Sequence, residues 1–318
     1  AGMFTPEDIA DRATEALELL LANGATAVRT HVNIGAGEEA LQAVREARSR
    51  MEGLLDVQIV ALTSNPITGP EGRENRRALA VALEVGVDLI GGCPHLDPDG
   101  TTLMTDAFAA ASDAGIGLDL HVDEMLDPEV LYLRELVRMV HDTGFAHPVT
   151  ASHCVTLGLQ SPDVQAAVSR EVADAGVSVV TLPQTNLFLQ GRNHPTATPR
   201  GLTAIEALRQ AGALVCAGAD NVQDPFNLVG RSDPLETAAL LVMAGHRLPD
   251  EAFRMIGADA RACLGLPSAA PVVGAVADLV AIDAPSVRGA IADAPMARKV
   301  FHRGRLVATT SQSRTIYR

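Results

Sequence analysis

Three short motifs carry the residues of this chain that are best suited to chemistry, and each follows a short apolar run. The motifs are His121-Val122-Asp123-Glu124, Ser152-His153-Cys154 and Ala219-Asp220-Asn221. Short continuous apolar runs are typical of buried parallel strands, and the ends of such strands converge on one mouth of a barrel. Histidines and carboxylates that meet there indicate metal-assisted hydrolysis.

Each side chain in these motifs suits a role. His121 ends a strand, where a neutral imidazole can bind a divalent metal. Glu124 is expected in the loop over the mouth, where it could move a proton between water and substrate. His153 could bind the metal or could hydrogen-bond the water and the substrate, and Asp220 could bind the metal and accept a proton. Their agreement in position favours function over the structural alternatives, which are a His121–Asp123 pair, a helix-capping Glu124, a packed His153 and a turn at Asp220.

Other residues are weaker candidates for the site. His95 could line the substrate pocket, and Gln190 and Arg192 follow residues 181–189 in an expected loop over the site, as substrate contacts or as loop anchors. For His31, a structural or supporting role is favoured over metal ligation. The remaining histidines are expected to be solvated: His141, His147, His194, His246 and His302.

Alternating strands and helices would position these residues. Apolar strands are expected at residues 27–32, 56–62, 87–91, 117–121, 148–153, 177–181 and 214–217. Helical stretches are expected at residues 7–21, 37–51, 72–84, 127–141, 162–175 and 204–211. This alternation predicts a parallel α/β sheet. Seven strand–helix units are present where a closed barrel has eight, and the chain opens on a helix, so the first strand is expected to be missing ahead of Ala1.

The C-terminal part changes character. Helices are expected at residues 231–246 and 250–264, and short β runs follow at residues 275–283, 298–302 and 305–309. We expect two domains: a (β/α) barrel catalytic domain at residues 1–266, and a small β appendage at residues 267–318 that forms part of a composite β-sandwich. Three short strands would leave unpaired edges, which again points to a missing N-terminal partner.

Composition excludes several classes of function. The net charge is −14, which makes a polyanion such as nucleic acid a poor partner. The four cysteines are isolated from one another, which argues against a zinc knuckle or disulfide framework and fits a reducing cytosol. We therefore expect a cytoplasmic protein, and the sequence shows no leader and no apolar run of membrane-spanning length.

Two chemistries are excluded by the distribution of lysine. Lys299, near the C-terminus, is the single lysine of the chain. No expected barrel strand therefore carries a lysine for a Schiff base or for a carbamate that bridges two metals. A glycine-rich phosphate loop and a Gly-x-Ser-x-Gly elbow are also absent from the sequence.

The chain resembles the cytosine deaminase branch of the amidohydrolase superfamily. The segments that carry the resemblance run in order along the chain: residues 28–32, 56–61, 121–124, 149–153, 186–192, 218–225 and 277–280. Residues 219–224 also resemble the N-isopropylammelide hydrolases of triazine breakdown. The resemblance implies a mononuclear zinc or iron hydrolase in a distorted (β/α)8 barrel, from a family that commonly packs into dimers or larger rings.

The resemblance also implies roles for individual residues. His121 and Asp220 match metal ligands, Glu124 matches the proton-shuttling acid, His153 matches the histidine beside the metal-bound water, and Gln190 matches the loop glutamine.

Two departures from the family pattern bear on function. The His-x-His pair of the family's first strand does not occur in this sequence, and His31, on a later strand, cannot replace it. Ser64 stands near the place of a ring-binding glutamine, Asn221 replaces a second aspartate, and Phe226 stands where a tryptophan is usual. With Gln190 and His95, these three residues are the expected substrate contacts.

These observations predict a metal-dependent hydrolase, in effect a deaminase, of a small cyclic amidine or aminopyrimidine-like molecule, in which metal-activated hydroxide attacks a ring carbon. A cyclic amide or N-alkylamino-triazine amidohydrolase is the first alternative. A non-catalytic barrel that binds a ligand is the second, if the protein truly lacks the His-x-His pair. The chain as written is expected to bind metal weakly and to show little activity, because it holds half of the usual ligands.

Overall fold

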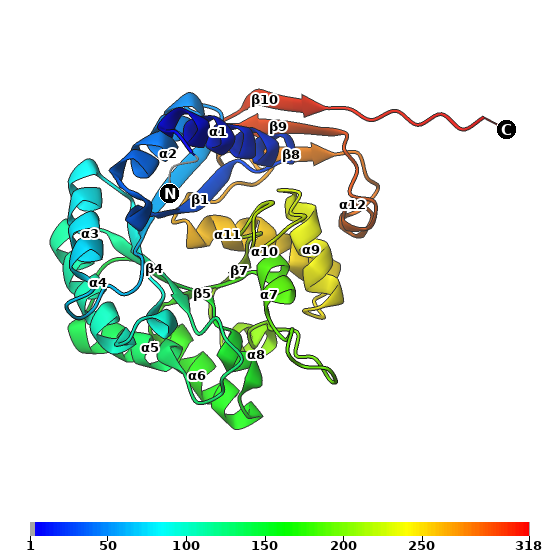
Figure 1. Cartoon of the computed structure of the whole chain (residues 1–318). Coiled ribbons are helices and arrows are strands. Elements are labelled where there is room, and N and C mark those ends of the chain that lie inside the picture. Colours follow the sequence, from blue (N-terminus) through cyan, green and yellow to red (C-terminus); the bar gives the residue numbers. More distant parts are fainter. Residues whose placement is uncertain (1–3, 318) are drawn as a thin grey trace.

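Seven parallel strands form one curved sheet whose spatial order follows the chain, from β1 to β7 (Figure 1). The computed structural model describes residues 4–317. The strands are β1 (Ala27–Asn33), β2 (Asp56–Leu62), β3 (Leu89–Gly91), β4 (Gly117–Val122), β5 (Val149–His153), β6 (Ser178–Thr181) and β7 (Val215–Ala217). Each predicted strand is present, which confirms the predicted α/β, barrel-like fold.

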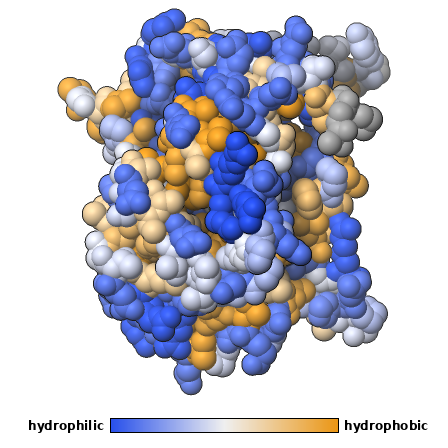
Figure 2. Space-filling view, turned by 60° about the vertical axis from the view of Figure 1, so that its left-hand side comes forward, coloured by the Kyte–Doolittle hydropathy of each residue, from blue (hydrophilic) through white to orange (hydrophobic). Residues whose placement is uncertain are grey.

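Helices lie around this sheet (Figure 1). They are α1 (Pro6–Ala22), α2 (Glu38–Arg50), α3 (Arg73–Val85), α4 (Gly100–Ala114), α5 (Tyr132–Thr143), α6 (Pro162–Asp174), α7 (Pro183–Leu189), α8 (Ile205–Gln210), α9 (Pro234–Met243), α10 (Pro249–Ile256) and α11 (Ala258–Cys263). Among residues 4–317, no helix combines the length and the apolarity that crossing a membrane requires. Figure 2, in which the left-hand side of Figure 1 comes forward, shows hydrophilic surface interrupted by apolar patches.

Three parts of the helical prediction were wrong. Helix α4 was not predicted, because its many threonines and alanines give a weak apolar period; Asp99 caps it by accepting a hydrogen bond from Thr102 N at 3.0 Å. Helix α7, which precedes the expected loop at Gln190 and Arg192, was not predicted either; it starts at Pro183, a residue suited to a first helical turn. The expected helix at residues 250–264 is two helices, α10 and α11, which Gly257 separates.

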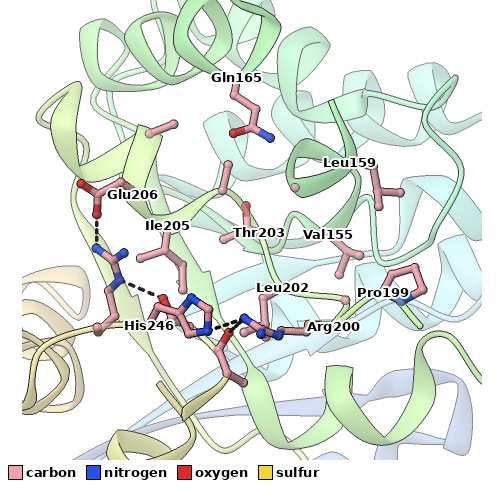
Figure 3. Close-up of a pocket in the computed structure, with 17 residues that line it drawn as sticks. Val155, Leu159, Gln165, Pro199, Arg200, Leu202, Thr203, Ile205, Glu206 and His246 are labelled. Carbon is pink, nitrogen blue, oxygen red and sulfur yellow. Dashed lines mark hydrogen bonds and ion pairs between the residues drawn. The ribbon is translucent and has the colours of Figure 1, made fainter. Parts of the chain in front are cut away.

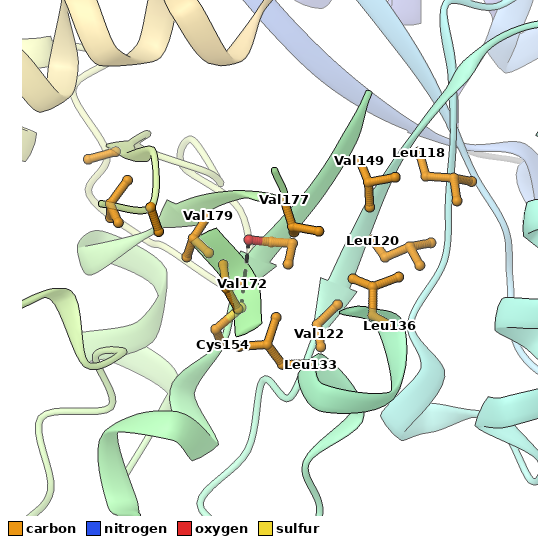
Figure 4. Close-up of a cluster of buried hydrophobic side chains, with 14 of the residues drawn as sticks. Leu118, Leu120, Val122, Leu133, Leu136, Val149, Cys154, Val172, Val177 and Val179 are labelled. Atoms are coloured by element: carbon orange, nitrogen blue, oxygen red, sulfur yellow. Dashed lines mark hydrogen bonds between the residues drawn. The ribbon is translucent and has the colours of Figure 1, made fainter. Parts of the chain in front are cut away.

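The alternation of β4 explains how one strand serves both the core and the site. Leu118, Leu120 and Val122 are fully buried among the apolar side chains of the outer layer, which include Leu133 and Leu136 of α5 (Figure 4). Successive side chains of a strand point to opposite faces. The intervening residues, Asp119 and His121, therefore face the interior of the curved sheet.

A second, antiparallel sheet lies next to α1. It contains β8 (Leu279–Ile282), β9 (Arg298–His302) and β10 (Arg305–Thr310) in the order β10-β9-β8, and α12 (Val287–Asp293) connects β8 to β9. A small apolar cluster joins it to α1 and α2: Leu17, Leu21, Ala47, Met51, Leu55 and Val300. The division into domains at residue 266 stays a prediction.

His302 corrects one expectation about the second sheet. It was expected to be solvated, but its side chain is 1% exposed, and its Nδ1 lies 3.1 Å from Asp278 Oδ1. Asp56, Asp278 and His302 are the one trio among residues 4–317 whose ligand atoms all lie within 4.8 Å of one another. Arg303 and Arg261 each approach one of the carboxylates at 2.8 Å. Because two guanidinium groups already balance two carboxylates, we interpret this trio as an ion-pair network that anchors the sheet.

Candidate active site

Residues from the ends of three strands meet at the centre of the curved sheet. The ring of His121, on β4, lies 4.9 Å from the ring of His153, on β5. On the two sides of the His153 ring, Nδ1 lies 3.5 Å from Glu124 Oε1, and Nε2 lies 3.8 Å from Asp220 Oδ2. The four residues predicted to form the centre of the site are therefore neighbours in space.

The backbone is strained where these strands end. Asp123, His153 and Asp220 have φ angles of 53°, 70° and 64°, in the left-handed region that residues other than glycine rarely adopt. In the alternation of β5, His153 has the parity of Val149 and Ala151, which pack in the outer layer. Its positive φ ends the strand and brings its ring inward. Strain of this kind clusters at functional sites, where the surrounding structure maintains it.

His31, on β1, lies beside this group. Its ring is 4.8 Å from that of His121 in an edge-on arrangement, and its Nε2 is 3.6 Å from Asp119 Oδ1. Asp119 also accepts hydrogen bonds from Arg29 Nη1 at 2.8 Å and from Ser152 Oγ at 2.8 Å. Burial raises the pKa of Asp119, but His31 and Arg29 outweigh it and hold that pKa well below its usual value.

The Arg29–Asp119 ion pair was not predicted as part of the site. The signal in the sequence was a charged residue inside each of two expected strands, and such residues are seldom buried unless they are paired.

His31 and the two histidines of the candidate site each have one buried ring nitrogen without a hydrogen-bond partner. These atoms are His31 Nε2, His121 Nδ1 and His153 Nε2. Burial, followed by the neighbouring His31 and His153, lowers the pKa of His121 to about 3. Burial lowers the pKa of His153 to about 4. Both rings are therefore neutral near pH 7, as a ligand nitrogen or a hydrogen-bond acceptor must be.

The pKa values of Glu124 and Asp220 are both raised. Burial, and then the charge of Asp220, raises the pKa of Glu124 to about 8, and burial also raises the pKa of Asp220. Burial raises the pKa of Cys93 to about 12, with smaller contributions from Glu124 and Asp220. The thiol of Cys93 therefore stays protonated beside the two carboxyl groups.

Two of the predicted substrate contacts adjoin this group. Gln190 Nε2 donates to the backbone oxygen of Glu124 at 3.2 Å, which ties the segment after α7 to the loop after β4. His95 is close enough to His153 to lower the pKa of that ring, and its own Nδ1 is buried without a partner.

The other three predicted contacts are engaged elsewhere or exposed. Asn221 accepts a hydrogen bond from Thr185 Oγ1 at 3.1 Å and donates to Asp224 Oδ2 at 2.6 Å. Ser64 Oγ donates to Asn33 Oδ1 at 2.5 Å. Phe226 is 51% exposed, in the loop after β7. A role for these three in substrate binding stays a prediction.

Asn186 is a further residue of the site, to which the sequence analysis gave no role although it opens one of the segments that carry the resemblance, residues 186–192. It lies on α7, is fully buried, and its Oδ1 is 2.9 Å from His153 Nδ1. No side-chain pattern in the sequence assigned Asn186 a partner, because the contact joins two segments that are 33 residues apart.

Asp123 proves to be a structural residue. Its carboxylate accepts hydrogen bonds from the backbone nitrogens of Tyr132 at 2.9 Å and Leu133 at 3.0 Å, at the start of α5. The alternative in which Asp123 pairs with His121 is therefore not observed. Burial raises the pKa of Asp123 to about 7, and the two backbone donors oppose that rise.

Replacing Asp123 by alanine should lower the free energy of unfolding by about 2 kcal/mol, because two buried N–H groups lose their acceptor. Urea unfolding followed by circular dichroism measures this loss. Asp127→Ala, in the exposed part of the same loop, is the control and should change stability by less than about 0.5 kcal/mol. Equal effects of the two substitutions would contradict the capping role.

A separate hollow of about 390 Å³ lies away from this group (Figure 3). It is lined by residues that include Thr203, Glu206 and His246, and none of the predicted site residues contributes to it. Arg200 Nη1 lies 2.7 Å from His246 Nε2 at its edge. We assign no function to this hollow.

Comparison with known proteins relates the chain to a family of hydrolases. The sequence profile of the amidohydrolase family matches residues 3–308. The chain is 33% identical over 289 residues to the pterin deaminase of Rhizobium rhizogenes, an alignment that covers 88% of this chain and 65% of that protein. The chain thus spans about 65% of the length of this relative.

Two solved structures extend the comparison. The 5-methylcytosine deaminase from Klebsiella pneumoniae bound to 5-fluorocytosine superimposes with a TM-score of 0.89 at 26% identity, covering 99% of this chain and 78% of that one. The N-isopropylammelide isopropylaminohydrolase from Burkholderia multivorans superimposes with a TM-score of 0.81 at 30% identity, covering 93% of this chain and 74% of that one.

Proposed function

The chain belongs to the amidohydrolase family, as its sequence predicted, and we propose that it is a metal-dependent deaminase of a small nitrogen heterocycle with an amidine group, such as an aminopyrimidine or a pterin. The observation that carries the proposal is the convergence of His121, Glu124, His153 and Asp220 at the strand ends. The names of two relatives, a pterin deaminase and a 5-methylcytosine deaminase, support this class of substrate.

The donor atoms of the group fit a divalent metal. His121 Nδ1 is a buried, neutral nitrogen without a partner, and the carboxylate of Asp220 is close enough to affect the titration of that ring. Imidazole nitrogen and carboxylate oxygen are donors that zinc and iron accept. His121 and Asp220 would hold the ion, which when bound would polarise a water molecule and make it nucleophilic near neutral pH.

The other steps follow from the protein's own side chains. Asp220 would take the proton of the attacking water. Glu124, whose pKa is raised to about 8, holds a proton near pH 7 and would deliver it to the ring nitrogen of the substrate. His153 lies between these two acids, where it can hydrogen-bond either the water or the tetrahedral adduct. Gln190, tied to the backbone of Glu124, would contact the ring.

A second candidate is the hydrolysis of an N-alkylamino-triazine. The similarity to the N-isopropylammelide isopropylaminohydrolase favours it. The two reactions differ in the leaving group, which is ammonia for a deaminase and an alkylamine for the triazine hydrolase.

A substrate panel assayed with excess metal tests the proposal. The protein is stripped with a chelator, supplied with excess Zn²⁺ or Fe²⁺, and assayed for ammonia release from cytosine, 5-methylcytosine, isocytosine and pterin, and for isopropylamine release from N-isopropylammelide. We expect one aminopyrimidine-type ring to release ammonia only after metal is restored. Excess metal is used so that the site is saturated during the assay.

Paired histidine variants provide the control. His121→Ala should abolish the metal-restored activity, whereas His141→Ala, at an exposed position on α5, should leave it unchanged. Absence of turnover on every substrate in excess metal would contradict the proposal and favour a barrel that only binds its ligand.

A further inference from the structure

We propose that Asn186 is a positioning residue that keeps the proton of His153 on Nδ1, so that Nε2 offers a lone pair to the attacking water. This inference rests on the proposed hydrolytic function. It assigns the hydrogen bond of His153 to the water and not to the tetrahedral adduct.

The atoms around His153 Nδ1 indicate that this nitrogen carries the proton of the ring. Asn186 Oδ1 lies 2.9 Å from Nδ1, and Glu124 Oε1 lies 3.5 Å from the same atom. Both His153 and Asn186 are fully buried, and burial disfavours the charged imidazolium. A neutral imidazole carries one proton, and the other nitrogen is an acceptor. Because the amide oxygen of Asn186 can only accept a hydrogen bond, its contact with Nδ1 places the proton on Nδ1.

Helix α7 holds Asn186 in place. The backbone nitrogen of Asn186 donates a hydrogen bond to Leu182 O at 3.0 Å, and the backbone oxygen of Asn186 accepts one from Gln190 N at 2.9 Å. Gly201 packs so closely against this turn that a Cβ atom there would lie 2.5 Å from Gln190 Cβ and 3.3 Å from Asn186 O. The amide is therefore presented from a helix that is packed on the neighbouring chain.

The other side of the ring shows what this tautomer would do. Nε2 has no hydrogen-bond partner and lies 3.8 Å from Asp220 Oδ2. With the proton on Nδ1, both of these atoms accept hydrogen bonds. A water molecule that donates one hydrogen to each would keep an oxygen lone pair free to attack the ring carbon. Loss of the partner that orients a metal-bound histidine typically costs about 10–100-fold in activity, and we expect an effect of similar size for His153.

The opposite orientation of the Asn186 amide would make His153 Nε2 a hydrogen-bond donor in place of an acceptor. If the nitrogen of the Asn186 amide faced Nδ1, the proton of His153 would move to Nε2. Nε2 would then donate a hydrogen bond to the developing oxyanion of the adduct. The two arrangements differ in an observable property of the resting protein, the protonation state of each ring nitrogen.

Nitrogen-15 NMR of histidine-labelled protein, without metal or substrate, tests the proposal directly. The resonances of His153 are assigned by their loss in His153→Gln. We expect Nδ1 at a pyrrole-like shift and Nε2 at a pyridine-like shift. In Asn186→Leu, which keeps the volume but removes the acceptor, the two shifts should move toward a mixture of tautomers. In Asn186→Asp, which restores an acceptor, they should return.

Kinetics of the metal-restored protein provide the second readout. Asn186→Leu should lower kcat about 10–100-fold with little change in KM, and Asn186→Asp should recover most of kcat. Asn193→Ala, at an exposed position after α7, is the matched control and should alter neither readout. A proton on Nε2 in the unmodified protein, or unchanged shifts in Asn186→Leu, would overturn the proposal. Because the NMR readout needs no turnover, it distinguishes this failure from failure of the proposed function.

Discussion

Glu124→Gln is expected to lower kcat about 10³-fold at neutral pH, because the substitution removes the group that delivers a proton to the substrate. Glutamine has nearly the same shape as glutamic acid, but it cannot release a proton. The loss corresponds to about 4 kcal/mol of transition-state stabilisation, within the range that one general acid contributes. Steady-state kinetics on the best substrate of the panel, with excess metal, measure it.

The matched control is Glu129→Gln, five residues further along the same loop and exposed to solvent. It should leave kcat and KM unchanged. Binding of the substrate by Glu124→Gln, measured by calorimetry, should be within about threefold of the unmodified protein, because the lost interaction belongs to the transition state. A Glu124→Gln protein with normal kcat would remove Glu124 from the mechanism.

Arg298→Met is expected to lower the free energy of unfolding by about 3–5 kcal/mol, the range found when one partner of a buried ion pair is removed. Arg298 is fully buried on β9, and it donates to both carboxylate oxygens of Asp233, at 2.8 and 2.7 Å. It also donates to Asn23 O at 2.6 Å. Asp233 caps α9 by accepting from Leu235 N at 2.9 Å. One side chain therefore connects the second sheet to α9 and to the end of α1.

Lys299→Met is the control for Arg298→Met. Lys299 is the next residue of β9 and points to solvent, so its replacement should change stability by less than about 0.5 kcal/mol. Asp233→Asn keeps an acceptor for the cap, and combined with Arg298→Met it should recover part of the lost stability because no unpaired buried charge remains. Urea unfolding measures all four proteins. Equal stabilities for Arg298→Met and Lys299→Met would contradict the importance of the ion pair.

The strands and the residues at their ends were predictable for a physical reason. A buried parallel strand needs a continuous apolar run, and this requirement is local, so residues 117–121 and 148–153 were located to within two residues. Helix α4 escaped prediction because its small residues pack without a pronounced apolar stripe. Helix α7 escaped because residues 183–189 are too short for a helical period to stand out against a loop.

The finer features of the site depend on contacts between distant parts of the chain. His153 has the strand parity of an outward residue, and its φ of 70° turns the ring inward. Asp123 has a spacing that suits a partner for His121, yet it caps α5, nine residues further on. Neither outcome follows from local sequence, because each depends on which donors and acceptors the tertiary structure brings within reach.

By itself, the sequence determined the alternation of strands and helices, the set of residues at the strand ends, and the resemblance to the amidohydrolases. These follow from the apolar period and from residue type, which neighbouring residues specify. The tertiary structure alone decided that Asn186 would face His153 from 33 residues away, that Arg298 would meet Asp233 from 65 residues away, and that burial would keep both histidines neutral. The physical reason is that hydrogen-bond partners and desolvation depend on the packing of the whole chain.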